Sequence, residues 1–431
     1  MNARKSLIIA TLAALASAAP AVAQQGEATG TLALGAKAGS DTAAVATNDS
    51  AKAEEAENSM LPGLVVQHFR PYDQRGLNVF EPPKEAGVPF EGFKLRLGAA
   101  FTQQFQGLEH SNTAAPKLSA PDAAGKQTNL NQLLDIGYGF NNAVANLYLD
   151  AQITKGIRVA MTTYLSSRHH NEAWVKDGYL LIDDSPLAVP ALEKLMEYVT
   201  IKAGHFEINY GDAHFRRSDN GNSMYNPFVG NYILDAFTTE IGTEVYLRSN
   251  GLIAMVGATG GEIKGNIAQP DDRSPAFLGK LGFDKQLNDD LRVRLTGSAY
   301  TIAKSPGNTL YAGDRAGSRF YSVLENTQST TAAQFTSGLL NPGFRYKVTA
   351  FMVNPFIKYQ GIELFGVAEQ AKGRSATEAA ERTWNQYAVD AVYRFAPREQ
   401  LFVGGRYNTA KGELPGMPTK VGADRYEIGG G

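Results

Sequence analysis

The stretch ANLYLDAQITKGIRVAMTTYL, residues 145–165, has apolar side chains at alternate positions on both sides of a short Thr-Lys-Gly turn. A period of two places alternate side chains on opposite faces of a β-hairpin. One face carries residues such as Leu149 and Val159, and the other carries Asp150 and Arg158. The apolar face must therefore meet either a second layer of protein, as in a soluble sandwich, or the hydrocarbon of a membrane.

Residues 1–23 have the features of a signal peptide. Basic residues precede an apolar run that ends in small residues, which predicts cleavage after Ala23 and export. Residues 24–62 are rich in small and acidic residues and contain no aromatic side chain, so we expect a flexible polar periplasmic lead. The remaining chain, residues 63–431, is predicted to form the folded part of the protein.

The composition excludes several classes of protein. The exported part contains no run of 18 apolar residues, which argues against membrane-spanning helices, whereas a membrane barrel needs apolar residues only at alternate strand positions. The absence of cysteine excludes disulfides, thiolate zinc sites and cysteine nucleophiles. Because 41 basic residues are balanced by 43 acidic ones, nothing indicates a nucleic-acid partner.

From residue 93 onward, candidate strands are joined by connections that are alternately long and short. Outer-membrane barrels have this arrangement, with short periplasmic turns and long external loops. The pattern predicts an all-β fold, a transmembrane antiparallel up-and-down β-barrel in the bacterial outer membrane. The candidate strands cover residues 93–106, 136–153, 157–166, 174–183, 198–210, 236–248, 252–262, 276–287, 291–303, 344–359, 362–370, 384–395, 401–410 and a start at 423.

Two further features of these segments are informative. Three glycines at the end of the chain suit a strand poorly, so we expect a natural barrel of about 16 strands, with about 14 present and the C-terminal end truncated. The connection at 184–197 is long for a turn and predicts one or two turns of amphipathic helix on the short-turn side.

Charged residues occupy the other face of the strands. Each would cost ~2–4 kcal/mol at the midplane of a bilayer, so we expect them to line a water-filled channel. The abundance of arginine favours anions, and a general porin with mixed wall charge is equally consistent. Internal ion pairs in a plugged barrel are the alternative. The predicted pore-lining residues are Arg96, Arg158, Lys202, Glu207, Arg292, Arg294, Arg394 and Arg406.

Motifs for catalysis are lacking. The sequence contains no G-x-S-x-G, no P-loop and no dinucleotide fingerprint. The histidines at 169–170 suit a polar loop tip, and the group of His205, Glu207, Asp212 and His214 points in alternating directions along a strand rather than around a metal. We therefore expect no enzymatic activity, no cofactor and no metal site.

The stretch GHFEINYGDAHFRRSDNGNSMYNPFVGNYILDAFTTE, residues 204–240, resembles outer-membrane porins of the phosphate-selective porin O and P type. The resemblance lies in Ala-Gly-His-Phe at 203–206, Asn-Tyr-Gly-Asp at 209–212 and a loop with Asn-Pro-Phe at 226–228. It implies a sixteen-stranded barrel, homotrimers in outer-membrane lipid, and passage of small hydrophilic solutes or anions. It also implies that a long loop at 211–234 folds into the lumen.

The resemblance further implies constriction residues within that loop, namely Arg216, Arg217, Asp219 and Asn226. Phosphate selectivity does not carry over, because no stack of arginines or cluster of lysines matches beyond Arg216 and Arg217. The predicted function is a diffusion porin, and the alternative is a non-conducting structural or adhesion barrel.

Overall fold

The computed structural model describes residues 66, 68–82, 84, 89–141, 144–166, 172–218, 223–313, 320–330, 336–417 and 419–431. The predicted signal peptide and polar lead lie outside the described residues, as does Asp219. In the part of the chain that is described, no helix is long and apolar enough to cross a membrane.

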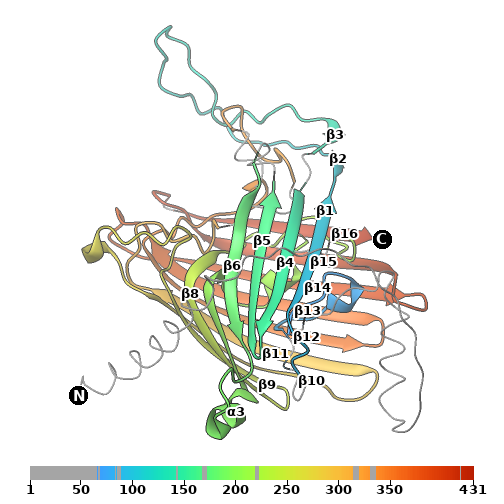
Figure 1. The fold of residues 1–431 in the computed structure, drawn as a ribbon. Coiled ribbons are helices and arrows are strands. Elements are labelled where there is room, and N and C mark those ends of the chain that lie inside the picture. Colours follow the sequence, from blue (N-terminus) through green and yellow to red (C-terminus); the bar gives the residue numbers. More distant parts are fainter. Residues whose placement is uncertain are drawn as a thin grey trace. The chain divides into compact units, whose positions relative to one another are not determined.

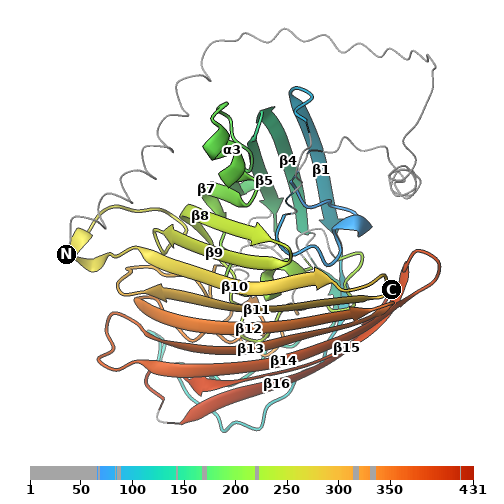
Figure 2. The same cartoon turned by 90° about the horizontal axis from the view of Figure 1, so that it is seen from below.

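Fourteen strands form one antiparallel sheet, in which each strand pairs with its neighbour along the chain (Figures 1 and 2). This is the predicted all-β, up-and-down topology, and each candidate strand has its counterpart. The strands of the sheet are β1 (Lys94–Thr102), β4 (Val144–Thr154), β5 (Ile157–Leu165), β6 (Trp174–Ile182), β7 (Val199–Glu207), β8 (Thr239–Ser249), β9 (Leu252–Thr259), β10 (Ala276–Gln286), β11 (Leu291–Ile302), β12 (Lys347–Tyr359), β13 (Ile362–Arg374), β14 (Arg382–Phe395), β15 (Leu401–Glu413) and β16 (Lys420–Gly430).

The sheet has two open edges, and the described residues show no pairing between β1 and β16. Two more strands, β2 (Phe105–Gly107) and β3 (Tyr138–Phe140), form a separate small hairpin in the long connection between β1 and β4. The expectation of about fourteen strands in this chain is therefore confirmed for the main sheet, whereas a closed ring of strands is not what the described residues form.

Short turns gather at one end of the sheet. The turn between β8 and β9 has Asn250 and Gly251 with φ of 49° and 89°, the positive values that a two-residue hairpin turn requires. Helix α3 (Pro190–Met196) lies at this end, where the sequence predicts helical turns, and the β2–β3 hairpin lies at the opposite end (Figure 1). Three single-turn 3-10 helices are η1 (Gln74–Gly76), η3 (Ala213–Arg216) and η4 (Pro270–Asp272).

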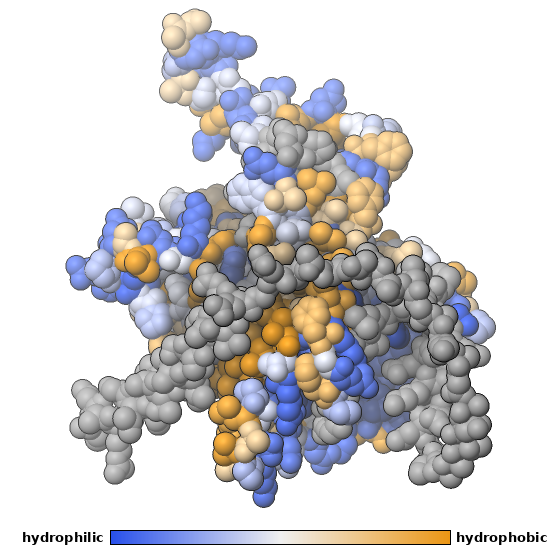
Figure 3. Space-filling view, viewed as in Figure 1, coloured by the Kyte–Doolittle hydropathy of each residue, from blue (hydrophilic) through white to orange (hydrophobic). Residues whose placement is uncertain are grey.

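The two faces of the sheet differ in exposure, residue by residue. On β14, Tyr387 and Val389 are 56% and 57% exposed, while Ala388 between them and Asp390 after them are 4% and 1% exposed. We call the exposed side the outward face and the buried side the lumenal face. Leu147, exposed on β4, belongs to the outward face as the sequence predicts. Figure 3 shows apolar side chains gathered on this face over the strands at the centre of Figure 1.

Two segments cover the lumenal face. The first, here called the N-terminal segment, comprises residues 68–82, and the second, the inward loop, comprises residues 208–218 and 223–238. Phe80 from the first and Ile233 from the second belong to the main hydrophobic cluster, together with lumenal side chains such as Trp384. Side chains of the chain itself thus occupy much of the interior of this sheet.

Candidate functional site

The charged residues predicted to line a pore do lie on the lumenal side, where most are held in ion pairs. Arg394 contacts Glu363 at 2.7 Å, and Arg292 contacts Asp284 at 2.7 Å. The remaining partners are Asp150 for Arg96, Asp183 for Arg158, Glu244 for Lys202 at 3.7 Å, His214 for Glu207 and Asp390 for Arg406 at 2.7 Å. Their pairing corresponds to the alternative of internal ion pairs, and their role in lining a pore stays a prediction.

Arg294 is the centre of the most extensive of these clusters. Its Nε lies 2.8 Å from Asp212 Oδ2, and its Nη1 lies 2.7 Å from Glu81 Oε2. Lys280 Nζ lies 2.9 Å from Asp212 Oδ1, and the Thr296 hydroxyl donates to Asp212 at 2.7 Å. Because Glu81 belongs to the N-terminal segment and Asp212 to the inward loop, this cluster fastens both segments to the wall formed by β10 and β11.

The sequence does not predict the role of the N-terminal segment. Besides Glu81, the segment places Asn78 within hydrogen-bonding distance of Glu363 at 2.5 Å, and the Arg216 guanidinium donates to Asn78 at 2.7 Å. Its three aromatic side chains pack inside the sheet, and Tyr72 stacks on Tyr148 of β4 with ring centroids 3.8 Å apart. The sequence does contain an indication of this packing. The three aromatic residues follow a stretch, residues 24–62, that contains no aromatic residue, and they precede the first strand with alternating apolar residues.

The inward loop lies where the resemblance implies, against the lumenal face. Tyr232 donates to the carboxylate of Asp390 on β14 at 2.8 Å. The backbone amides of Ile233 and Leu234 donate to side chains of β15 and β14 at 2.6 and 2.8 Å. Two backbone N–H groups that take no part in strand pairing thereby find hydrogen-bond acceptors on the wall. The function of this loop as a constriction stays a prediction.

The predicted loop residues occupy different surroundings. Arg217 is buried and paired with Asp235 of the same loop at 2.6 Å. Arg216 and Asn226 line a small cavity of about 20 Å³, together with Arg394 and Arg406 of the wall. Asp219 lies outside the described residues.

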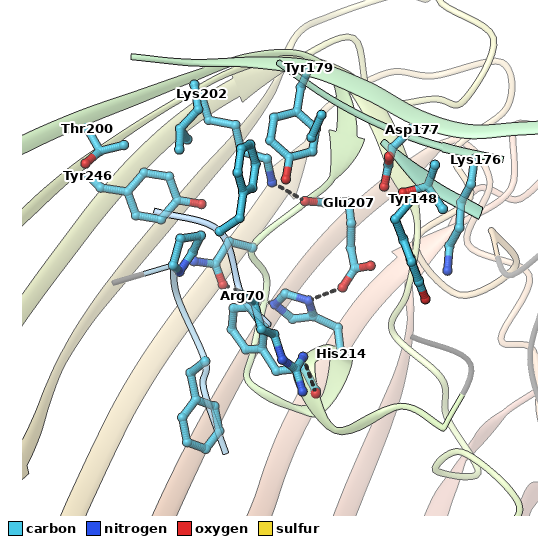
Figure 4. A pocket seen from close by; sticks show the side chains of 18 of the residues that line it. Arg70, Tyr148, Lys176, Asp177, Tyr179, Thr200, Lys202, Glu207, His214 and Tyr246 are labelled. Carbon is cyan, nitrogen blue, oxygen red and sulfur yellow. Dashed lines mark hydrogen bonds and ion pairs between the residues drawn. The ribbon is translucent and has the colours of Figure 1, made fainter. Parts of the chain in front are cut away.

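A larger cavity, here called the chamber, lies between the two segments and the wall formed by β4 to β8. Its volume is about 160 Å³. Of the predicted pore-lining residues, Lys202 and Glu207 contribute to it, whereas Arg292 and Arg294 do not. In Figure 4, His214 of the inward loop bonds to the Glu207 carboxylate, and Lys202 donates to the Glu207 carbonyl oxygen at 2.9 Å.

Positive charge exceeds negative charge around the chamber. The lining includes the cations Arg70, Lys176, Lys202 and Arg248 and the carboxylates of Asp177 and Glu207. Burial lowers the pKa of Arg70 to about 10, which leaves the guanidinium charged at neutral pH. A preformed hollow of this kind can hold a small anion.

Acid is expected to break the attachment of the N-terminal segment through Glu81 at low pH. Burial raises the pKa of Glu81, but Arg294 and Lys280 outweigh it and bring the value to about 2 from the ordinary 4.5. Since the folded-state pKa is depressed, the stabilisation is complete above pH 4.5 and is lost as the pH falls through about 2. Conductance should rise as the pH falls from 4.5 through about 2. Glu81→Gln should lack this rise, and an identical rise in that variant would contradict the assignment.

Comparison with protein-family models gives no match, and neither does comparison with curated proteins. Solved structures with a similar arrangement include a trimer form of OmpT, an outer-membrane protein of Vibrio cholerae, at 10% identity and a TM-score of 0.43, covering 79% of this chain and 84% of that one. They also include an anion-selective porin from Comamonas acidovorans, at 12% identity and a TM-score of 0.38, with 75% and 79% covered. A third is the outer-membrane channel DcaP of Acinetobacter baumannii, at 11% identity and a TM-score of 0.37, with 80% and 99% covered.

Proposed function

We propose that this chain forms a channel in the bacterial outer membrane for passive diffusion of small hydrophilic solutes. The observation that carries the proposal is the division of the sheet into two chemically different faces. Along the strands, apolar and aromatic side chains are exposed on the outward face, while the charged side chains lie on the lumenal face. A bilayer accepts the first face and excludes the second.

The outward face exposes too many apolar side chains to be in contact with water alone. Exposed large hydrophobic side chains occur on β1, β4, β8, β9, β10, β12, β13, β14 and β15, far beyond the single apolar patch of a typical monomeric soluble protein. On β14, the aromatic residues Tyr387, Tyr393 and Phe395 lie toward the ends of the exposed row, with Val389 and Ala391 between them. Aromatic girdles flank the apolar band in transmembrane barrels.

The path for solutes is proposed to pass through the chamber. The inward loop and the N-terminal segment occupy much of the lumenal side, and the chamber, of about 160 Å³, lies between them and the wall. Its four cations against two carboxylates support a preference for anions. Arg292 and Arg294 are less suitable for this role, since they do not line the chamber.

A non-conducting barrel is the second candidate, and one observation favours it. The interior contains many buried ion pairs, and two chain segments are fastened to the wall, as expected of a plugged lumen. Both candidates share the same fold and the same place in the membrane, so they differ in the permeability of the interior.

Planar-bilayer recording separates these two functions. Purified, heat-modifiable protein should give discrete steps of current, and the reversal potential in a chloride salt gradient should favour the anion. Lys202→Gln should lower the anion preference, with Arg292→Gln as the comparison that changes it less. Folded protein that inserts into lipid but passes no current would refute the channel and leave the plugged barrel.

The homotrimer stays a prediction, which cross-linking in native membranes would check.

A further inference from the structure

We propose that the chamber is a binding site for a monocyclic aromatic carboxylate, an anion of the benzoate class. The inference rests on the proposed function, because it names a solute that the channel would hold on its way through. It depends on three properties of the chamber, which are its aromatic walls, its cations and its volume.

Aromatic side chains form much of the wall. Seven of the twenty lining residues are phenylalanine or tyrosine, and they come from strands and from both inner segments. Tyr72 and Tyr148 present a stacked pair with an interplanar angle of 10°. Tyr179 and Tyr246 bring rings from β6 and β8 to the same cavity (Figure 4). Such rings offer faces and edges against which another ring can pack.

Arg248 is the cation best placed to hold a carboxylate. Its Nη2 donates to the Thr200 hydroxyl at 3.0 Å, and its Nη1 donates to the carbonyl oxygen of Pro82. Among the described residues it has no carboxylate within ion-pair distance, and its Nε is buried without a hydrogen-bond partner. A planar guanidinium with a buried donor to spare matches a carboxylate in shape and charge.

Lys176 supports the same assignment from β6. It is 2% exposed, and its Nζ lies 5.1 Å from the centre of the Phe237 ring. Buried ammonium groups are strongly disfavoured unless anions or aromatic rings stabilise them. A bound anion would add such stabilisation and would explain why cations outnumber carboxylates around this cavity.

The volume fits a single ring. The chamber measures about 160 Å³, and an apolar cavity of roughly 150 Å³ is known to accept benzene. Inorganic phosphate would leave the aromatic walls without a partner, and a two-ring anion would exceed the space. The chemistry of the lining therefore selects an aromatic ring that bears one carboxylate.

Calorimetry on the detergent-solubilised full chain tests this without depending on conductance. Benzoate should bind about tenfold more tightly than benzyl alcohol, which lacks the charge, and than cyclohexanecarboxylate, which lacks the aromatic ring; tenfold corresponds to about 1.4 kcal/mol. Inorganic phosphate should not displace it. Equal binding of benzoate and either comparator, displacement by phosphate or no binding of benzoate would each overturn the proposal.

Variants locate the site within the protein. Arg248→Gln should weaken benzoate binding about tenfold, because it removes a charge-assisted hydrogen bond. Lys358→Gln is the matched control, since Lys358 pairs with Glu399 at 2.6 Å, lies outside the chamber and should leave the affinity unchanged. Unaltered affinity in a folded Arg248→Gln protein would overturn the assignment. Binding without current would refute the channel alone, and current without binding would refute the aromatic-anion site alone.

Discussion

Arg294→Gln is expected to destabilise the folded chain by about 3–5 kcal/mol and to raise the conductance of the channel. The side chain of Arg294 is fully buried, and its three carboxylate partners are Asp212, Glu81 and Asp284. Glutamine would leave the carboxylates of Asp212 and Glu81 with Lys280 as their remaining cation. Removing one partner of a buried ion pair lowers the stability of the fold because the charges that remain are buried and uncompensated.

The expected rise in conductance follows from the position of this cluster. Arg294 binds the N-terminal segment through Glu81 and the inward loop through Asp212, so its loss weakens the attachment of both to the wall. Urea unfolding of the protein in lipid vesicles measures the stability, and single-channel recording measures the current. Higher current with lower stability is the combination that this cluster predicts.

Lys358→Gln is the control for that experiment. Lys358 lies on the neighbouring strand β12, its side chain is 27% exposed, and it pairs with Glu399 at 2.6 Å. Partly exposed pairs contribute about 0–1 kcal/mol, so the effect on stability should be small. If both variants lose the same stability and pass the same current, Arg294 does not hold the two segments in place.

Removal of residues 68–82 is expected to increase conductance and to abolish the binding of benzoate. The deletion removes Glu81, which binds Arg294 of the wall, and Asn78, which binds Arg216. It also removes Tyr72 and Phe80 from the lining of the chamber. The strands of the sheet keep all their pairings, because the first of them starts at Lys94. Single-channel recording and calorimetry measure the two effects.

A deletion of residues 24–62 serves as the comparison, since it shortens the chain before the N-terminal segment and leaves that segment in place. It should leave both conductance and benzoate binding as they are in the full chain. An unchanged current after removal of residues 68–82, from protein that remains heat-modifiable, would show that the segment does not narrow the path.

The strands could be predicted because their cause is local. Tyr387, Val389 and Tyr393 recur at a period of two and face outward in the structure. Asp390 between them and Arg394 directly after them face the lumenal side. A period of two fixes the face of every residue on a strand once one residue is placed, so the sequence suffices for this level.

The interior could not be predicted in the same way, because its contacts join distant parts of the chain. Arg294 reaches a partner 82 residues away in Asp212 and another 213 residues away in Glu81. Alternation shows that Arg294 faces inward, but nothing in its neighbourhood shows what it meets there. Water was therefore expected where the structure has carboxylates. The N-terminal segment was missed for the same reason, since it has no periodicity and its packing depends on the wall.

Oxygen accessibility of spin labels along β14 tests most directly whether lipid contacts the outward face. The chain contains no cysteine, so a single cysteine can be introduced at Val389 or Ala391 on the outward face and at Ala388 or Val392 on the lumenal face, and labelled in lipid vesicles. We expect high accessibility to oxygen and low accessibility to a water-soluble nickel chelate at 389 and 391, and low oxygen accessibility at 388 and 392. Labels at 389 and 391 that oxygen reaches no better than those at 388 and 392 would mean that protein, not lipid, covers this face.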